Sequence, residues 1–540
     1  MNAKRNSKND LLCWGICSAA LVLLAFAMPF NGHWITDGGN KLMVMENFLS
    51  CGSFAMQNPA SAIDPENRFF PDAVFHFQKT ARGIYSVFPP YFSLLTAPFY
   101  KFCGPAGKYV LPLLAGAGVL LLLPGILRRW HLPSNWLLPA ALFATPLAFY
   151  AVEFWEMTLG VLPVLGMILL LYLRKDLRAG VLLAGGLWLR PEMFFFAAVT
   201  TAILALEQPR RAGRFAAGFA AGMLPYGIVQ FLLFGNITGL HGATYADASR
   251  EFLWNYHYYF FSCKATALAA GVAAILLGCA PRFRSLKNAK IILCTLVAAG
   301  SLMLLRSLLN APQPVTDCVM TIGLFTTTPF VFFLAMNWRP LWNHPVYRLR
   351  LAARITLLYT LILPPLLTST DLGIIWGARH WLFLLPLMVP LAWFAARDRK
   401  TKLVLLILFF ISAGFQLHGL RTQYRMRKNS VLLTEFLRQN TRDVIVTDVF
   451  FLPMQTPELF RERRWLFVKN GQEMLDAVRI LREKNLPFTM VRSAHGDFRR
   501  IGNETLAELL KACAVPEKPQ FIRLKDTAFL NMDVFQLVHR

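Results

Sequence analysis

The stretch Asn31-Gly-His-Trp-Ile-Thr-Asp-Gly-Gly39 interrupts the chain directly after an apolar run from Leu11 to Phe30. Roughly seventy residues then pass before apolar runs resume, and such a connection is far longer than those between elements of a compact domain. The stretch also places a carboxylate, Asp37, at the expected lipid boundary. Small-molecule carriers usually join successive spans by short turns, so this loop predicts a structured site at a membrane surface.

The composition indicates a membrane protein. Of 540 residues, 56% are hydrophobic and 16% are charged, whereas soluble domains carry about 25% charged residues. Apolar runs near the roughly 20 residues that span a bilayer recur along most of the chain. The basic residues Lys4, Arg5 and Lys8 before the first run resemble a signal peptide, but no small-residue cleavage pattern follows. We therefore expect an α-helical polytopic membrane protein whose first run is a retained anchor.

About thirteen transmembrane helices are predicted, with boundaries accurate to a few residues. The predicted spans are 11–30, 108–127, 134–152, 157–173, 179–189, 192–206, 215–234, 263–280, 289–309, 318–337, 353–370, 381–396 and 402–418.

The net charge of the chain is +25, and the basic residues are distributed in a pattern that matches the predicted spans. Basic clusters occur at every second junction: 128–129, 174–178, 210–214, 282–290, 339–354 and 397–402. By the positive-inside rule these junctions are cytoplasmic, so the N-terminus is cytoplasmic and an odd number of spans places the tail outside. Because the charge lies in short loops rather than on one face, no nucleic-acid partner is expected.

The chain divides into two predicted domains. Residues 1–418 form a transmembrane domain with a first external loop at 31–107, and residues 419–540 form a small external domain. In the tail, strand-length apolar runs alternate with amphipathic helical stretches, which predicts an α/β fold. No Gly-rich phosphate loop opens a helix there, so no soluble nucleotide site is predicted.

The first external loop begins with a predicted interfacial helix. Leu42, Met45 and Phe48 recur at helical spacing, and Gly52 provides the expected end. Asp37 precedes this helix, so its carboxylate has two interpretations. It either caps the helix N-terminus or takes part in chemistry at the membrane surface.

Five stretches together resemble a known group. They are TDGGNK (36–41), SVFPPYFSLLTAPFYKFCG (86–104), AFYAVEFWEMTLG (148–160), GGLWLRPE (185–192) and WGARHWLFLLPL (376–387). In order and topology they resemble GT-C membrane glycosyltransferases, the superfamily that includes protein O-mannosyltransferases and lipid A aminoarabinose transferases. The resemblance covers most of the chain, although each motif is loose.

The resemblance implies transfer of a sugar from a polyprenyl-phosphate donor to a lipid, glycan or protein acceptor on the outer face of a bacterial inner (plasma) membrane. Such a reaction needs a base for the acceptor hydroxyl and cations for the leaving phosphate. Asp37 resembles the first-loop carboxylate that is expected to be the base. The other candidates are Glu153 and Glu156 for catalysis, Arg190, Arg379 and Lys41 for the donor phosphate, and Glu192, His380 and Trp376 nearby.

Several candidates also have plainer interpretations. Glu153 and Glu156, on one helical face at i and i+3, are also compatible with a position at the membrane interface. Arg190 and Glu192 flank a proline and can form a local ion pair. Arg379 can extend along the interface rather than grip a phosphate.

The metal requirement and two other functions stay open. Some relatives use a divalent cation and others do not, while His33, His241 and His257 are expected at the surface rather than as metal ligands. A transporter or flippase of lipid-linked sugars would explain the spans and membrane-edge charges equally well, but not the long loop and external tail. An inactive homologue that serves as a partner subunit is a third hypothesis.

Overall fold

The computed structural model describes residues 2–71, 76–240, 259–261, 287–310, 323–366, 376–493, 520–523 and 531–537. The chain forms two compact units. The helical unit comprises Met1–Met28 and Tyr109–Thr422, and the mixed unit comprises Pro29–Lys108 and Gln423–Arg540. The loop predicted to be external, 31–107, and the tail therefore belong to one unit, although they are separated by most of the chain.

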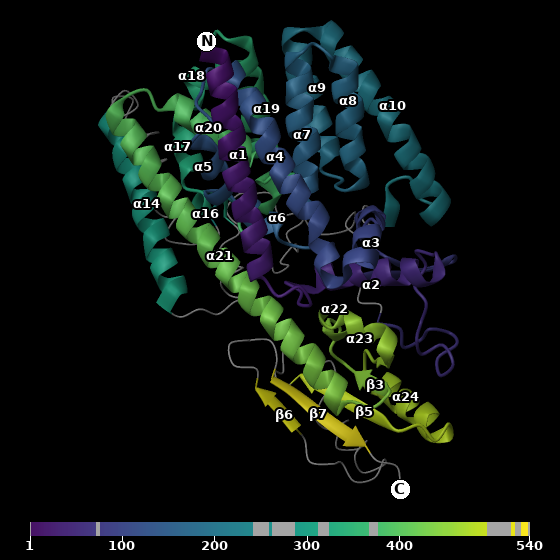
Figure 1. Cartoon of the computed structure of the whole chain (residues 1–540). Helices are drawn as coiled ribbons and strands as arrows, with labels where there is room; N and C mark the ends of the chain where they lie inside the picture. The colour runs from purple at the N-terminus through teal and green to yellow at the C-terminus, as the bar shows by residue number, and fades with distance from the viewer. Residues whose placement is uncertain are drawn as a thin grey trace. The chain divides into compact units, whose positions relative to one another are not determined.

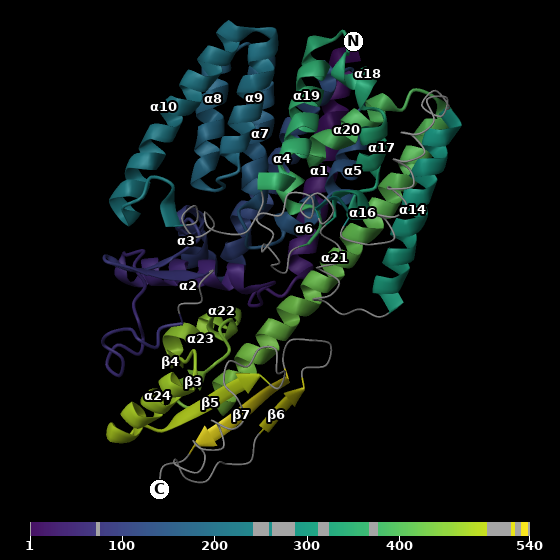
Figure 2. The same cartoon turned by 180° about the vertical axis from the view of Figure 1, so that it is seen from behind.

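The described part of the helical unit consists mainly of α-helices, and α7, α8, α9 and α10 pack side by side (Figures 1 and 2). Its helices are α1 (Asn2–Ala27), α4 (Val110–Arg129), α5 (Leu137–Phe143), α6 (Leu147–Ala151), α7 (Met157–Tyr172), α8 (Asp176–Gly185), α9 (Met193–Glu207), α10 (Pro209–Phe234), α14 (Lys287–Asn310), α16 (Leu324–Thr327), α17 (Phe330–Met336), α18 (Trp338–Trp342), α19 (Tyr347–Ile362), α20 (Leu385–Ala395) and the part of α21 (Arg399–Asn440) up to Thr422.

The predicted polytopic helical fold is confirmed. Among the described residues, five helical segments are long and apolar enough to cross a membrane, and shorter apolar helices accompany them. The five are Lys8–Ala27, Tyr91–Arg129, Pro209–Phe234, Lys290–Asn310 and Arg399–Asn440. The predicted span 263–280 lies outside the described residues, as do the start of 318–337 and the end of 353–370.

The predicted span 134–152 is not one continuous helix. It is divided into α5 and α6 around Pro146, which has no N–H to donate and disfavours helical geometry in the residue before it. The chain leaves helical geometry again after α6 and resumes it at Met157. Glu153 and Glu156 therefore lie in a break between helices, and the expected i, i+3 helical face was wrong.

The helix that contains the last predicted span, 402–418, is longer than that span. The structure has a single helix of 42 residues, α21, because nothing in the charged stretch after residue 418 stops a helix. Gly419 is a packing residue within this helix. A Cβ there would lie 2.2 Å from Cε2 of Trp376, so only glycine fits.

The mixed unit is built on a five-stranded sheet with strand order β4-β3-β5-β7-β6. β3 runs parallel to β4 and β5, whereas β7 is antiparallel to β5 and β6. Its tail elements are β3 (Val444–Thr447), α22 (Leu452–Gln455), α23 (Pro457–Glu462), β4 (Arg464–Phe467), α24 (Gly471–Glu483), β5 (Phe488–Ser493), β6 (Gln520–Arg523) and β7 (Asn531–Leu537). From the first loop come α2 (Thr36–Cys51), β1 (Phe77–Thr80), β2 (Gly83–Ser86) and α3 (Tyr91–Cys103).

Residues of the first loop complete both cores of this sheet. Alternate strand residues point to opposite faces, so Ile445 packs with α2, α22 and α23 while Val446 packs with α24. Phe70 joins the first core and Phe69 the second. The N–H of Phe467 donates to the carbonyl of Phe69 at 2.8 Å, so the loop also covers the edge strand β4. The predicted α/β tail thus has a core that it shares with the first loop.

Candidate functional site

The mixed unit places Asp37 in the first turn of α2. Ile35 occupies the N-cap position, with φ −147° and ψ 175°, so Asp37 lies two residues inside the cap. The N-cap interpretation is therefore wrong in its position. A carboxylate in the first turn still interacts favourably with the positive end of the helix dipole.

His76 lies beside Asp37, and sequence reasoning missed it. Its Nε2 is 3.8 Å from Oδ1 of Asp37 and 3.0 Å from Oγ1 of Thr36. Burial lowers the pKa of His76, and the charge of Asp37 opposes that shift only in part. The imidazole is therefore neutral at pH 7. No sequence spacing marks it, because the β1–β2 hairpin segment brings it to α2.

Lys41 follows Asp37 by one helical turn, on the same face of α2. It is 2% exposed, and its Nζ lies 4.5 Å from the centroid of the Phe88 ring. The Ser93 hydroxyl donates to the Lys41 carbonyl at 2.9 Å. The ammonium group of Lys41 is therefore buried beside the Phe88 ring, and α3 contacts the backbone of the same residue.

The second glycine of the TDGGNK stretch is required by packing. A Cβ on Gly39 would lie 1.6 Å from the carbonyl oxygen of Met454, so α2 approaches α22 more closely than any other residue allows. Asn40, the next residue, donates to the His76 carbonyl at 3.1 Å and accepts from the Ser86 hydroxyl at 2.6 Å. These contacts set the position of the helix that carries Asp37.

In the helical unit, Arg190 joins two carboxylates. Its Nη1 lies 3.2 Å from Oε1 of Glu156, its Nε lies 3.1 Å from Oε2 of Glu192, and its Nη2 also contacts Glu192. Glu156 is 3% exposed and ends the break before α7, while Glu192 precedes α9. The local ion pair expected from the Arg-Pro-Glu sequence is present and extends to Glu156.

His380 and Arg379 continue this group. His380 Nδ1 lies 3.6 Å from Oε1 of Glu192, and Arg379 Nε donates to His380 Nε2 at 3.3 Å. The two ring nitrogens of His380 therefore face different neighbours, Nε2 the Arg379 guanidinium and Nδ1 the Glu192 carboxylate. Arg379 is 8% exposed and its guanidinium lies 5.4 Å from the Trp155 ring centroid. Arg379 is thus buried among aromatic and imidazole groups rather than extended along a surface.

We call Glu156, Arg190, Glu192, Arg379 and His380 the charged cluster. Tyr259, which sequence reasoning missed, packs edge-on against His380 with ring centroids 5.8 Å apart. Of the other candidates in this unit, Glu153 is buried in the same helix break, and its carbonyl accepts from the N–H of Trp155 at 2.8 Å.

Trp376 has a packing role in the helical unit. Its indole N–H donates to Gln416 at 3.2 Å, and its carbonyl accepts from the Tyr150 hydroxyl at 2.8 Å. It is fully buried at the start of the turn that carries Arg379 and His380. The side chain therefore anchors this turn.

A second buried group of charges lies in the mixed unit. His33 Nε2 is 2.8 Å from Oε1 of Glu458, and Lys108 Nζ is 4.0 Å from the same oxygen. His33 is 1% exposed, so its expected surface position was wrong. Burial alone would raise the pKa of Glu458, but His33 and Lys108 lower it to about 2. His241 and His257 lie outside the described residues.

The described ranges contain no group of three or more His, Cys, Asp or Glu side chains placed to hold a metal ion. Among these residues we therefore name no candidate ligands for a divalent cation.

Comparisons with known proteins complete the description of the fold. No protein-family model and no curated protein sequence matches the chain. The crystal structure of ArnT from Cupriavidus metallidurans bound to undecaprenyl phosphate matches over 97% of this chain and 97% of that chain, with 10% identity and a TM-score of 0.50. The chain has the GT-C fold.

A second solved structure is similar at a lower score. Archaeal oligosaccharyltransferase AglB from Archaeoglobus fulgidus, in complex with an inhibitory peptide and a dolichol-phosphate, has 12% identity and a TM-score of 0.47, and the match covers 97% of this chain and 74% of that one. The match to the ArnT structure confirms the predicted resemblance to GT-C proteins as a likeness of fold, and the chain is an integral membrane protein.

Proposed function

We propose that this GT-C-fold protein is a glycosyltransferase that moves a sugar from a polyprenyl-phosphate-linked donor to an acceptor on the outer face of the membrane. The observation that carries the proposal is the charged cluster, which is built at helix breaks inside an apolar bundle. Ionisable groups in such surroundings are costly and mark substrate sites. The ArnT structure with this fold holds undecaprenyl phosphate, which is a ligand of the proposed kind.

Within the cluster, Arg379 is the stronger candidate for the donor phosphate. A phosphate that approached Arg190 would compete with the carboxylates of Glu156 and Glu192. Arg379 instead contacts Nε2 of His380 and the face of Trp155. A guanidinium can bind a phosphate through two parallel hydrogen bonds and stabilises the charge that develops as the phosphate leaves. We assign Arg190 to holding the two carboxylates, and Lys41 remains a further phosphate candidate.

Asp37 is the proposed general base. The acceptor hydroxyl oxygen attacks the anomeric carbon of the donor sugar, its proton passes to the Asp37 carboxylate, and the bond from carbon to phosphate oxygen breaks with its electron pair left on the phosphate. The neutral imidazole of His76, 3.8 Å away, can orient that carboxylate without neutralising it. Glu153 and Glu156 are further acidic candidates in the helical unit.

The proposal is tested by product analysis in reconstituted vesicles. Protein in proteoliposomes that contain a radiolabelled polyprenyl-phosphate sugar should release free polyprenyl phosphate and transfer the label when cell-envelope extract is supplied as acceptor. A flippase would instead move intact labelled donor across the bilayer without cleaving it. An inactive homologue would do neither, so each of these two results would overturn the proposal.

A further inference from the structure

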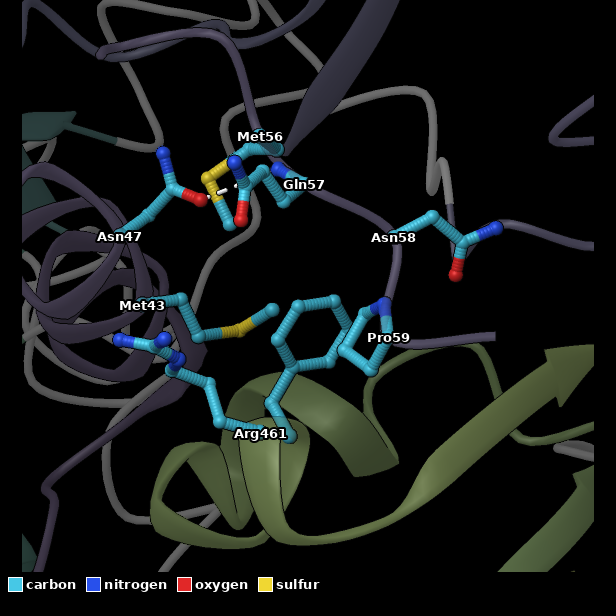
Figure 3. Close-up of a pocket in the computed structure, with 8 residues that line it drawn as sticks. Met43, Asn47, Met56, Gln57, Asn58, Pro59 and Arg461 are labelled. Carbon is cyan, nitrogen blue, oxygen red and sulfur yellow. Dashed lines mark hydrogen bonds between the residues drawn. The ribbon is translucent and has the colours of Figure 1, made fainter. Parts of the chain in front are cut away.

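A pocket of about 240 Å³ lies in the mixed unit, and Asp37 is not among its lining residues (Figure 3). It is lined by the second half of α2, the segment after Gly52 and the end of α23. The lining residues are Met43, Asn47, Met56, Gln57, Asn58, Pro59, Phe460 and Arg461.

The walls of the pocket are held by the amide of Asn47. Its Nδ2 donates to the carbonyls of Ser53 at 2.8 Å and Ala55 at 3.0 Å, while its Oδ1 accepts from the N–H of Gln57 at 3.0 Å. One buried side chain therefore fixes three backbone positions of the segment, so the pocket is formed before any ligand arrives. Preformed sites avoid the cost of ordering a loop on binding.

The pocket is lined by both apolar and polar side chains. Met43 and Pro59 lie on different sides of the hollow (Figure 3), and Phe460 also lines it. Gln57 is exposed and offers an amide that can both donate and accept. Arg461 is held in place because its Nη1 donates to the carbonyl of Glu46 at 3.0 Å.

We propose that this pocket binds one pyranose unit of the acceptor, an inference that rests on the proposed function and specifies its acceptor. A pyranose has a face of C–H groups, which suits the Pro59 and Phe460 rings, and a rim of hydroxyls that both donate and accept. An acyl chain would leave the Gln57 amide and the Arg461 guanidinium facing hydrocarbon.

The position of the pocket decides the size of the acceptor. Asn47 follows Asp37 by ten residues on the same helix, which corresponds to about 15 Å along the axis. A sugar in the pocket is therefore distant from a hydroxyl that reacts beside Asp37. The acceptor is a glycan or glycolipid with several linked sugars, rather than a protein hydroxyl or a lipid with a single small headgroup.

Direct binding tests the pocket independently of transfer. The full chain is placed in nanodiscs without sugar lipids or maltoside detergent, and glucose, galactose, N-acetylglucosamine and glucuronate are offered separately in saturation-transfer NMR. We expect at least one to bind, with at least tenfold weaker binding in Gln57→Trp, which fills the pocket from an exposed position, and in Arg461→Ala. Arg482→Ala, an exposed arginine on α24, is the matched control and should bind as wild type does.

The pocket inference and the proposed function can be refuted independently of each other. If no sugar binds, if Gln57→Trp binds sugar as wild type does, or if the tripeptide Gly-Ser-Gly displaces the sugar, the pocket inference is wrong even when transfer is observed. If sugar binds as expected but wild-type protein never cleaves the donor, the pocket stands as a sugar site and the proposed function falls. With an active enzyme, Gln57→Trp should raise the KM for an oligosaccharide acceptor at least tenfold and leave donor cleavage by water unchanged.

Discussion

His33, which is buried, pairs with the partly buried Glu458, with Nε2 and Oε1 2.8 Å apart although 425 positions separate the two residues in the sequence. The pair joins the segment before α2 to the helix α23 within the mixed unit. Lys108 adds a second cation 4.0 Å from the same oxygen. The tail therefore stabilises the start of the loop that carries Asp37, and Lys108, just after the loop, contributes to the same contact.

Loss of this pair should destabilise the mixed unit. His33→Ala leaves Glu458 with a weaker set of partners in a buried setting, and we expect a loss of about 2–3 kcal/mol in the free energy of unfolding. Arg438→Ala is the control, because the Arg438–Glu462 pair is well exposed and should change stability by less than about 1 kcal/mol. Denaturant unfolding followed by tryptophan fluorescence measures both. Equal losses in the two variants would contradict a buried role for His33.

Glu46 should make stability fall as the pH rises. Burial raises its pKa from 4.5 to about 7, against the opposing hydrogen bond that the Tyr100 hydroxyl donates at 2.7 Å. The fold therefore favours the protonated acid. The contribution of protonated Glu46 to the free energy of unfolding is complete below about pH 4.5 and is lost by about pH 7. Glu46→Gln should remove that loss and stabilise the protein at pH 8 by on the order of 1–3 kcal/mol.

Thermal unfolding of wild type and Glu46→Gln at pH 5 and pH 8 provides the measurement. The two proteins should be close in stability at pH 5 and diverge at pH 8. A variant that is less stable than wild type at pH 8 would show that Glu46 acts there as a stabilising carboxylate.

Asp37→Asn should abolish most sugar transfer without unfolding the protein. The substitution retains the size of the side chain but removes the basic carboxylate, so transfer should fall about a hundredfold or more. Since Ile35 occupies the N-cap, loss of a cap does not explain such a result. Asp443→Asn, at an acidic residue that pairs with Arg464 in the same unit, is the control and should transfer at the wild-type rate. An Asp37→Asn protein of normal activity would eliminate Asp37 as the base.

Arg379→Ala should weaken use of the phosphate donor. Loss of a charge-assisted contact to the leaving phosphate corresponds to about 2 kcal/mol or more, or roughly thirtyfold in kcat/KM for the donor. Arg190→Ala should instead reduce the yield of folded protein, because it leaves two buried carboxylates without their shared cation. Arg348→Ala, at an exposed position on α19, controls for the change in net charge. Unchanged donor kinetics in Arg379→Ala would return this residue to a packing role.

Reporter fusions test the predicted orientation. A reporter placed after Arg129 or Arg399 should be cytoplasmic, whereas one inserted at the β1–β2 turn after Thr80 or placed after Asn440 should be external. The last position is at the end of α21, since the helix continues well past the span predicted from the sequence. A cytoplasmic reporter after Asn440 would overturn the odd number of spans and the outer location of the proposed reaction.

The sequence by itself determined the features that depend on local physical chemistry. The hydrophobic segments identify helices because partitioning into lipid depends on the residues of each segment alone. Gly52 ends α2 with φ 68°, and its N–H bonds the Phe48 carbonyl, as expected for a helix end that glycine favours. The alternating apolar runs of the tail became β3, β4 and β5, and the Arg-Pro-Glu sequence formed its ion pair.

Only the tertiary structure decided which of these local elements meet. Glu156 and His380 reach the Arg190–Glu192 pair from distant segments, and His76 reaches Asp37 through a hairpin. Such contacts depend on how complete helices and strands pack against one another, and this packing cannot be read from the spacing of residues in the sequence. Packing also explains a glycine whose role could not be predicted from the sequence. The sequence shows two adjacent glycines at 38 and 39, but only the approach of the Met454 carbonyl explains why residue 39 must be one.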